Sequence, residues 1–266
     1  MIDDQAEADS SLPPTSHARN GESPPRVLVV DVGGSHVKLL SQELTVPRKF
    51  VSGPTLTPKQ MVARVKRMAR DLQYKVLSIG YPGPILASRI VADPPNLGQG
   101  WVGFDFQRAF GKPVKLINDA AMQALGSYTG GKMLFLGLGT GLGSALVFNG
   151  MVEPMELAHL PYRRGTFEDY VGQRGLDRLG KKKWRKHVLD VIERLRAALL
   201  PEYVVIGGGN ARHVDELPEN CRFGNNANAF VGGFRLWQTS ARAHPDSFHV
   251  RDSAAVQGNP PSVSAP

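Results

Sequence analysis

The sequence predicts an α/β protein made of two related lobes. Apolar runs of strand length alternate with segments in which apolar residues recur at helical spacing. Two units, residues 26–40 and 133–149, share one design: an apolar strand, a glycine turn and a second strand. Hydrophobic residues make up 41% of the 266 residues, which is enough for a packed core at this length.

The first lobe is expected over residues 26–117 and begins with the strand–turn–strand unit of residues 26–40. Thr57 supplies a capping hydroxyl, Pro58 suits the first helical position, and the apolar residues that follow predict a helix up to about residue 72. Residues 76–85 predict a buried strand that runs into a Gly/Pro loop. Residues 114–119 predict a strand that ends in two polar residues.

The second lobe is expected over residues 118–238. Residues 120–128 predict a helix, residues 184–199 a long amphipathic helix, and residues 203–209 a strand entering a glycine loop. Residues 226–237 predict a short last helix, which packs within this lobe or back on the first one. Residues 1–25 and 239–266 are polar and rich in Ser and Pro, and we expect them to be disordered tails.

Composition limits the class of protein. The net charge of +8 attracts polyanions, but does not choose among nucleic acid, acidic lipid and a phosphate chain. No apolar run approaches the roughly 20 residues of a membrane-spanning helix, and the first 25 residues lack an apolar signal core. Cys221 is the single cysteine, which excludes an internal disulfide and a multi-cysteine zinc site. We expect a cytoplasmic protein without membrane contact.

The first glycine turn carries residues suited to phosphate and metal. Gly33 and Gly34 let backbone N–H groups approach phosphate oxygens, because no side chain intervenes. Asp31, at the strand end, can hold Mg²⁺ through water, and Lys38 can offset phosphate charge. A simple hairpin turn explains the same residues, so both interpretations stay open.

The other glycine segments are not standard nucleotide-binding motifs. The turn at 137–144 lacks the spacing of the dinucleotide fingerprint, and a strand rather than a helix follows it. Residues 126–133 come closer to a P-loop, but Met133 stands where the Mg²⁺-binding Ser or Thr is needed. The run GGGN at residues 207–210 has two interpretations. It can let a nucleotide or a phosphate chain lie against the backbone, or it can be only a strand-to-loop turn.

Polar residues of the second lobe are candidates for acid–base chemistry and sugar binding. A carboxylate at Asp119, between the two glycine turns, can accept a proton from an attacking hydroxyl, although a helix N-cap explains an Asp there as well. Glu156, His159 and Glu168 offer the acceptors that vicinal sugar hydroxyls need. A solvated loop is the simpler interpretation of these three, and zinc ligation by ExxH is a weak one.

A basic run, KKKWRKH at residues 181–187, begins the long helix. Anions are attracted to a basic helix N-terminus, although a solvated basic face explains the run too. The candidate contacts to a phosphate chain are Lys181, Lys182, Lys183, Arg185 and Lys186.

The order of these motifs resembles the ROK family of sugar kinases and regulators. The resemblance covers about residues 26–238 and is carried by DVGGSHVK, GYPGPI, PPNL, IND, LGLGTGLGSAL, ELAH, FEDYVG and VIGGGN. It implies a two-lobed hexokinase/actin-like (ribonuclease H-like) kinase fold with mixed sheets. It also implies phosphorylation of the 6-hydroxyl of glucose, with Mg²⁺ and either polyphosphate or ATP, by a homodimer.

The resemblance also implies roles for individual positions. Asp119 matches the catalytic base, and Asp31 the residue that holds Mg²⁺ through water. The positions that match sugar contacts are Asn96, Asn118, Glu156, His159 and Glu168. The positions that match the donor-binding segments are Asp31, Gly33, Gly34, Ser35, Lys38, Gly139, Thr140, Gly141, Gly143, Gly207, Gly208, Gly209 and Asn210.

The sequence departs from the family pattern in ways that bear on function. Residues 160–172 contain no cysteine where many members carry a zinc motif, so no zinc site is expected, and Ala158 replaces a usual glycine. Residues 1–25 cannot form a DNA-binding helix-turn-helix, which argues against a repressor. The basic residues lack interleaved aromatics apart from Trp184, so no nucleic-acid partner is expected. The alternatives are an ATP-dependent hexokinase for another sugar and a catalytically idle sugar-binding regulator. The presence of Asp31, Asp119 and both turns speaks against the idle protein.

Overall fold

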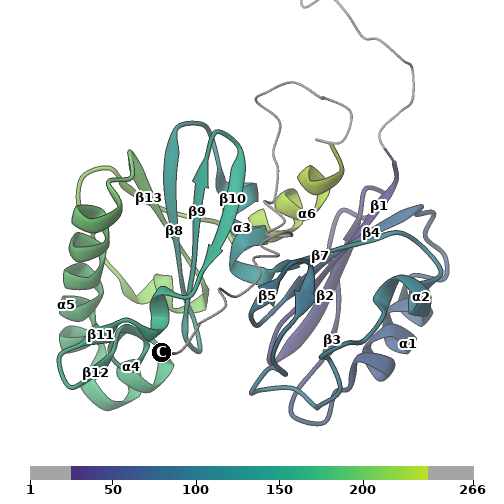
Figure 1. Ribbon diagram of the computed structural model, residues 1–266, viewed down its shortest axis with the longest axis horizontal. Helices are drawn as coiled ribbons and strands as arrows, with labels where there is room; N and C mark the ends of the chain where they lie inside the picture. Colours follow the sequence, from purple (N-terminus) through teal and green to yellow (C-terminus); the bar gives the residue numbers. More distant parts are fainter. Residues whose placement is uncertain (1–24, 239–266) are drawn as a thin grey trace, which may run out of the picture.

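Two five-stranded sheets form the framework of the protein, which is described here from a computed structural model for residues 25–238 (Figure 1). The predicted tails, apart from Pro25, lie outside the described residues. The first sheet contains β3 (Arg48–Val51), β2 (His36–Ser41), β1 (Val27–Val32), β4 (Val76–Tyr81) and β7 (Val114–Asn118), in that order. The second sheet contains β10 (Met151–Met155), β9 (Leu142–Phe148), β8 (Lys132–Leu138), β13 (Tyr203–Gly207) and β14 (Cys221–Phe223), in that order.

Both sheets have the same pairing pattern. In the first, β1 is antiparallel to β2 and parallel to β4; in the second, β8 is antiparallel to β9 and parallel to β13. The outer strands continue the pattern, with antiparallel β3 and β10 at one edge and parallel β7 and β14 at the other. The two strand–turn–strand units of the sequence are β1–β2 and β8–β9, and the predicted α/β fold with mixed sheets is confirmed.

Helices cover the sheets, and short elements connect them. The α-helices are α1 (Pro58–Met68), α2 (Phe106–Phe110), α3 (Asp119–Ser127), α4 (Phe167–Val171), α5 (Gln173–Leu199) and α6 (Asn228–Gln238). The remaining elements are β5 (Ile85–Leu86), β6 (Arg89–Ile90), η1 (Leu157–His159), β11 (Pro161–Tyr162), β12 (Gly165–Thr166) and η2 (Gly209–His213). Helix α1 begins as the sequence predicts, because Thr57 and Gln60 form a reciprocal capping box.

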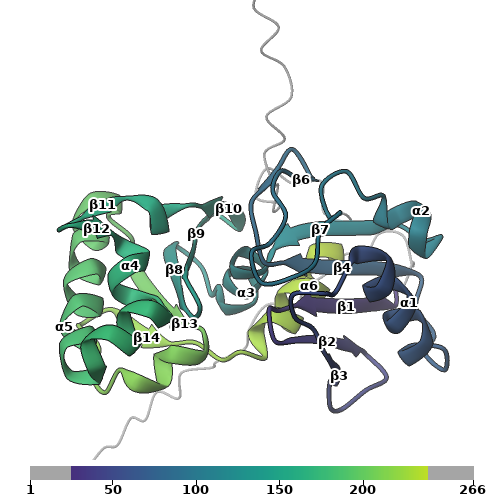
Figure 2. The same ribbon diagram turned by 90° about the horizontal axis from the view of Figure 1, so that it is seen from below.

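Three hydrophobic cores hold these layers together. One packs the first sheet against α1 and α2, and another packs the second sheet against α4 and α5. The third lies between the sheets and contains residues of both of them together with α3 and α6 (Figures 1 and 2). In this third core the buried Ser78 of β4 donates to the carbonyl of Gly233 at 2.6 Å and accepts from the indole of Trp237 at 3.0 Å. The last helix therefore contacts the first sheet directly.

Helix α5 has a break that matters for the basic run. Gly180 has φ 71° and ψ 158°, which is not a helical conformation, so residues 181–199 form a second helical section after it. Buried Trp184, Val188 and Ile192 attach this section to the second sheet. Of the helices within residues 25–238, none combines the length and apolar character that crossing a bilayer requires.

Candidate active site

The carboxyl ends of the parallel strands bring the main acidic residues together. Asp31 lies near the end of β1, and Asn118 ends β7 in the same sheet. Strand β7 runs directly into α3, whose first residue is Asp119. Because α3 also packs on β9, Asp119 lies on the element that joins the two sheets. This edge is where ligands bind in open α/β sheets.

Asn118, and not Asp119, is the N-cap of α3. The Asn118 side-chain oxygen accepts from the Ala121 N–H at 3.1 Å, and its amide donates to the Gly83 carbonyl at 3.1 Å. The capping alternative drawn for Asp119 is therefore wrong, because its neighbour fills that position. The Asp119 carboxylate accepts from the Ala120 N–H at 2.7 Å.

The surroundings of Asp119 raise the pKa of its carboxyl group to a value near neutral pH. Burial, followed by the negative charges of Asp31 and Glu156, raises the pKa of Asp119 to about 7, against the opposing effect of hydrogen bonds from the backbone N–H groups of Ala120 and Asp119. A carboxyl group with this pKa exchanges a proton at physiological pH. Asp119 can therefore act as a general base.

Asp31 and Lys38 form a charged pair across the first strand–turn–strand unit. They are register partners on β1 and β2, with Lys38 Nζ 3.5 Å from Asp31 Oδ2. Burial raises the pKa of Asp31, and the charge of Lys38 counteracts this effect. The single carboxylate fits an Mg²⁺ ion that is carried mainly by donor phosphates, since Mg²⁺ in such sites uses one or two carboxylates. Within residues 25–238, no three His, Cys, Asp or Glu side chains could share a metal ion.

Asn96 lies at the first glycine turn. A Cβ atom added to Gly34 would be 3.2 Å from the Cβ of Asn96, so the PPNL segment packs directly on the turn. The turn itself is closed by a hydrogen bond from the Gly33 N–H to the His36 carbonyl at 3.0 Å. The structure thus brings together two segments that the sequence suggested separately, one for the sugar and one for phosphate.

The second glycine turn meets two later segments of the chain. The Thr140 carbonyl accepts from the backbone N–H of Gln173, at the start of α5, at 3.0 Å. The buried Asn210 side chain donates to the Gly139 carbonyl at 3.1 Å and to the Gln173 side-chain oxygen at 3.0 Å. Gly139 and Gly209 both face open space, with no atom within 4 Å of an added Cβ. The fold does not need glycine at these two positions, whereas close approach of a ligand does.

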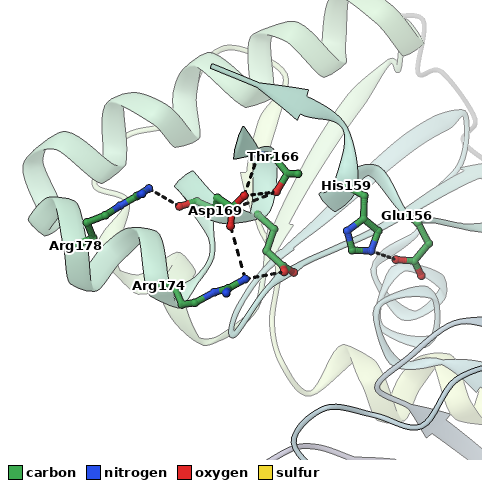
Figure 3. Close-up of polar contacts among 7 residues, drawn as sticks. Glu156, His159, Thr166, Asp169, Arg174 and Arg178 are labelled. Carbon is green, nitrogen blue, oxygen red and sulfur yellow. Dashed lines mark hydrogen bonds and ion pairs between the residues drawn. The ribbon is translucent and has the colours of Figure 1, made fainter. Parts of the chain in front are cut away.

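The proposed sugar-binding residues of this lobe lie on short helices. Glu156 precedes η1, and its carboxylate is 3.8 Å from His159 Nε2 (Figure 3). Burial raises the pKa of Glu156, His159 lowers it, and Glu168 raises it. Glu168 lies on α4 against the second turn, where an added Cβ on Gly141 would collide with its carboxylate. The solvated-loop interpretation is therefore wrong for Glu168. The signal that was missed is the Thr166–Asp169 capping box.

Two arginines of α5 that the sequence did not single out hold α4 in place. Arg174 Nη2 lies 3.6 Å from carboxylate oxygens of both Glu168 and Asp169. Arg178 donates to the Asp169 backbone carbonyl at 2.7 Å, so both arginines reach from α5 toward the same short helix (Figure 3). Neither has a motif around it, and only the packing of α4 on α5 gives them this role.

The basic run of α5 is divided by its surroundings. Lys181, Lys182, Lys183 and Lys186 are exposed. Arg185 instead donates to the His213 carbonyl and pairs with Asp215, so it fastens η2 to α5. Through Arg185, the run lies beside the segment that follows Asn210.

Comparison with known proteins agrees with the sequence motifs. A family model described as "ROK family" matches residues 27–153. The chain is similar to a polyphosphate glucokinase of Mycobacterium tuberculosis (strain ATCC 25177 / H37Ra), at 26% identity over 233 residues that cover 78% of this chain and 86% of that protein. The predicted resemblance to the ROK family is confirmed.

Solved structures confirm the fold. An inorganic polyphosphate/ATP-glucomannokinase from Arthrobacter sp. strain KM superposes with a TM-score of 0.71 at 21% identity, covering 81% of this chain and 99% of that chain. A ROK hexokinase from Thermus thermophilus superposes with a TM-score of 0.63 at 19% identity, again covering 81% and 99%. These similarities establish the hexokinase/actin-like architecture.

Proposed function

We propose that this chain, which carries ROK-family sequence motifs on the ROK kinase fold, is a sugar kinase that phosphorylates the 6-hydroxyl of glucose. Polyphosphate is the proposed donor, and ATP is the second donor. The observation that carries the proposal is the half-buried carboxyl of Asp119, whose pKa is about 7, at the junction of the two sheets with their glycine turns. The similar proteins named polyphosphate glucokinase and polyphosphate/ATP-glucomannokinase support the choice of donors.

In the proposed reaction, Asp119 accepts the proton of the sugar hydroxyl while the oxygen of that hydroxyl bonds to the terminal phosphorus of the donor. The bond between that phosphorus and its bridging oxygen breaks, so polyphosphate leaves one phosphate shorter and ATP leaves as ADP. Asn96 and Asn118 approach the sugar from the first sheet, and Glu156, His159 and Glu168 from the second. Closure of the two lobes over the sugar excludes water.

The donor phosphates lie against the glycine segments in this proposal. The proposed N–H donors to phosphate are those of Gly34 and Ser35 and of Thr140, Gly141 and Gly143, with Lys38 offsetting charge. The N–H groups of Gly33 and Gly139 close the turns by binding the carbonyls of His36 and Gly141, so these two glycines contribute close backbone approach instead. We expect the part of the donor farther from the reacting phosphorus to lie along the backbone of Gly207, Gly208, Gly209 and Asn210. Asp31 would hold Mg²⁺ through water, and a bound Mg²⁺ would supply charge neutralisation on the transferred group. The exposed lysines of the basic run are proposed contacts to polyphosphate, whereas Arg185, which the sequence also suggested, is already paired with Asp215.

The test is a coupled assay for glucose 6-phosphate in the presence of Mg²⁺, with polyphosphate and ATP compared as donors. We expect turnover with polyphosphate to exceed turnover with ATP. Turnover with ATP alone would keep the kinase and remove the polyphosphate assignment. Silence with both donors, followed by silence with a panel of other hexoses, would favour the idle sugar-binding protein. The cytoplasmic location, the homodimer and the lack of nucleic-acid or membrane partners stay predictions.

A further inference from the structure

The basic run of α5 presents its cations on different sides of the helix. At about 100° per residue, Lys181 and Arg185 share one flank, and Lys183 and His187 share the other. The packing agrees with this division. Arg185 binds the His213 carbonyl and Asp215 of the η2 region, whereas the His187 ring nitrogen lies 2.9 Å from the hydroxyl of Tyr162 in the β11–β12 hairpin. The run is therefore not a single surface.

The Lys181 flank is continuous with the segment that follows the second glycine turn. Asn210, which is bonded to Gly139, belongs to η2, and Arg212 and His213 come two and three residues later in the same short helix. Arg212 Nε donates to His213 Nε2 at 3.4 Å. Lys181, Arg212 and Arg185 lie close enough to His213 for their charges to lower its pKa, in addition to the effect of desolvation.

Two of these cations are available to a ligand. Arg212 and Lys181 are exposed, and within the described residues neither makes an ion pair with a carboxylate. Arg185 is different, because Asp215 neutralises it and its guanidinium serves the fold. His213, whose carbonyl binds Arg185 and whose ring nitrogen accepts from Arg212, adds a hydrogen-bonding group beside these cations.

We propose that Lys181 and Arg212, together with His213, form a subsite for the distal part of a polyphosphate chain whose reacting end lies at the second glycine turn. The subsite rests on the proposed function, and it refines that function by separating one flank of the basic run from the rest. A flexible chain of regularly spaced negative charges is the ligand that a row of separated cations fits. A donor must extend from the turn along η2 to reach both cations, so we expect the subsite to distinguish long polyphosphate chains from short ones.

The experiment compares two double variants with wild type in the full-length protein. K181A/R212A removes the subsite, and K66A/R67A removes two exposed cations of α1 in the other lobe, which controls for the loss of net charge. The first measurement is the Kd for long-chain polyphosphate without sugar. We expect K181A/R212A to weaken binding roughly three- to ten-fold and to reduce its salt dependence, and K66A/R67A to leave both unchanged.

A second measurement separates this subsite from the kinase proposal. In the coupled assay, K181A/R212A should raise the KM for long-chain polyphosphate while the KM values for short-chain polyphosphate, ATP and glucose stay within about two-fold. Binding that depends on Lys181 and Arg212 without any turnover would reject the kinase and retain the subsite. An unchanged Kd in K181A/R212A, or an equal loss in K183A/K186A from the other sides of the helix, would overturn the subsite. A single-stranded oligonucleotide bound as tightly as polyphosphate at the same residues would overturn it as well, because the surface would then select no particular polyanion.

Discussion

The two glycine turns have the same strand frame but carry different residues at equivalent positions. An apolar register pair flanks each turn. The pair is Val32–Val37 in the first sheet and Leu138–Leu142 in the second. The next pair is Asp31–Lys38 in the first unit and Gly137–Gly143 in the second. The same backbone thus presents two buried or half-buried charges in one lobe and no side chains in the other.

The difference separates two kinds of contribution to phosphate chemistry. The first unit supplies charge, since Asp31 and Lys38 face each other at 3.5 Å. The second supplies close backbone approach: a Cβ on Gly143 would be only 2.8 Å from that of Ala120, so α3 can pack tightly there. Because Asp119 precedes Ala120, the glycine pair also determines how near the proposed base lies to the second turn. Under the proposed function, related frames with unlike residues would let the first turn bind the metal and the second the phosphate oxygens.

The largest expected effect comes from the residue between the two units. Asp119→Asn removes the proposed base without changing side-chain size, and we expect kcat to fall by about 10²–10⁴-fold. Steady-state kinetics with glucose and the better donor would check this. Turnover at the wild-type rate would reject Asp119 as the base.

The same variant has a stability signature. The folded-state pKa of Asp119 is raised to about 7, so in wild type its stabilising effect is present at low pH and is lost as pH rises toward that value. Asp119→Asn lacks this titration. Its Tm relative to wild type should therefore increase between about pH 4 and pH 8, and a constant difference would show that the raised pKa is wrong.

Breaking the charged unit should have the second-largest effect. Asp31→Asn removes the carboxylate proposed to hold Mg²⁺ through water, and we expect a roughly 10–100-fold loss of activity. Because the negative charge of Asp31 raises the pKa of Asp119, the rising limb of the pH profile of kcat/KM should also move to lower pH. The residual activity, measured over a range of pH, would show this shift. An unmoved profile would mean that Asp31 and Asp119 are not coupled.

Alanine substitutions in the second glycine turn can separate its proposed contacts with the donor from its contact with Glu168. An alanine at Gly141 would displace the end of the Glu168 side chain, while an alanine at Gly139 enters open space. We expect Gly141→Ala to raise the KM for sugar roughly ten-fold, as for one lost hydrogen bond to a charged group, with little change in Tm. Gly139→Ala should instead raise the KM for donor. If both variants changed the same KM, the turn would not separate donor from acceptor.

The sequence predicted the parts of this site that local patterns encode. The two strand–turn–strand units and the Thr57 cap are visible because apolar spacing and capping residues act over a few neighbours. The N-cap of α3 could not be assigned between Asn118 and Asp119 from the sequence, since Asn and Asp both favour that position. The bond from the Gln173 N–H to Thr140 has no sequence signature, because it joins backbone groups that only the tertiary fold brings together.

The smallest effect compares two capping boxes, one in each lobe. Thr57 with Gln60 begins α1, and Thr166 with Asp169 begins α4, which carries Glu168. Thr57→Ala and Thr166→Ala each remove one cap and should each cost about 1 kcal/mol of stability. Only Thr166→Ala should also raise the KM for sugar, since a frayed first turn of α4 releases Glu168 from the second glycine turn. Thermal unfolding and sugar kinetics on both variants measure the two effects separately. Equal KM values would mean that Arg174 and Arg178 hold α4 without its cap, and the position of Glu168 would then depend on the packing of α4 against α5.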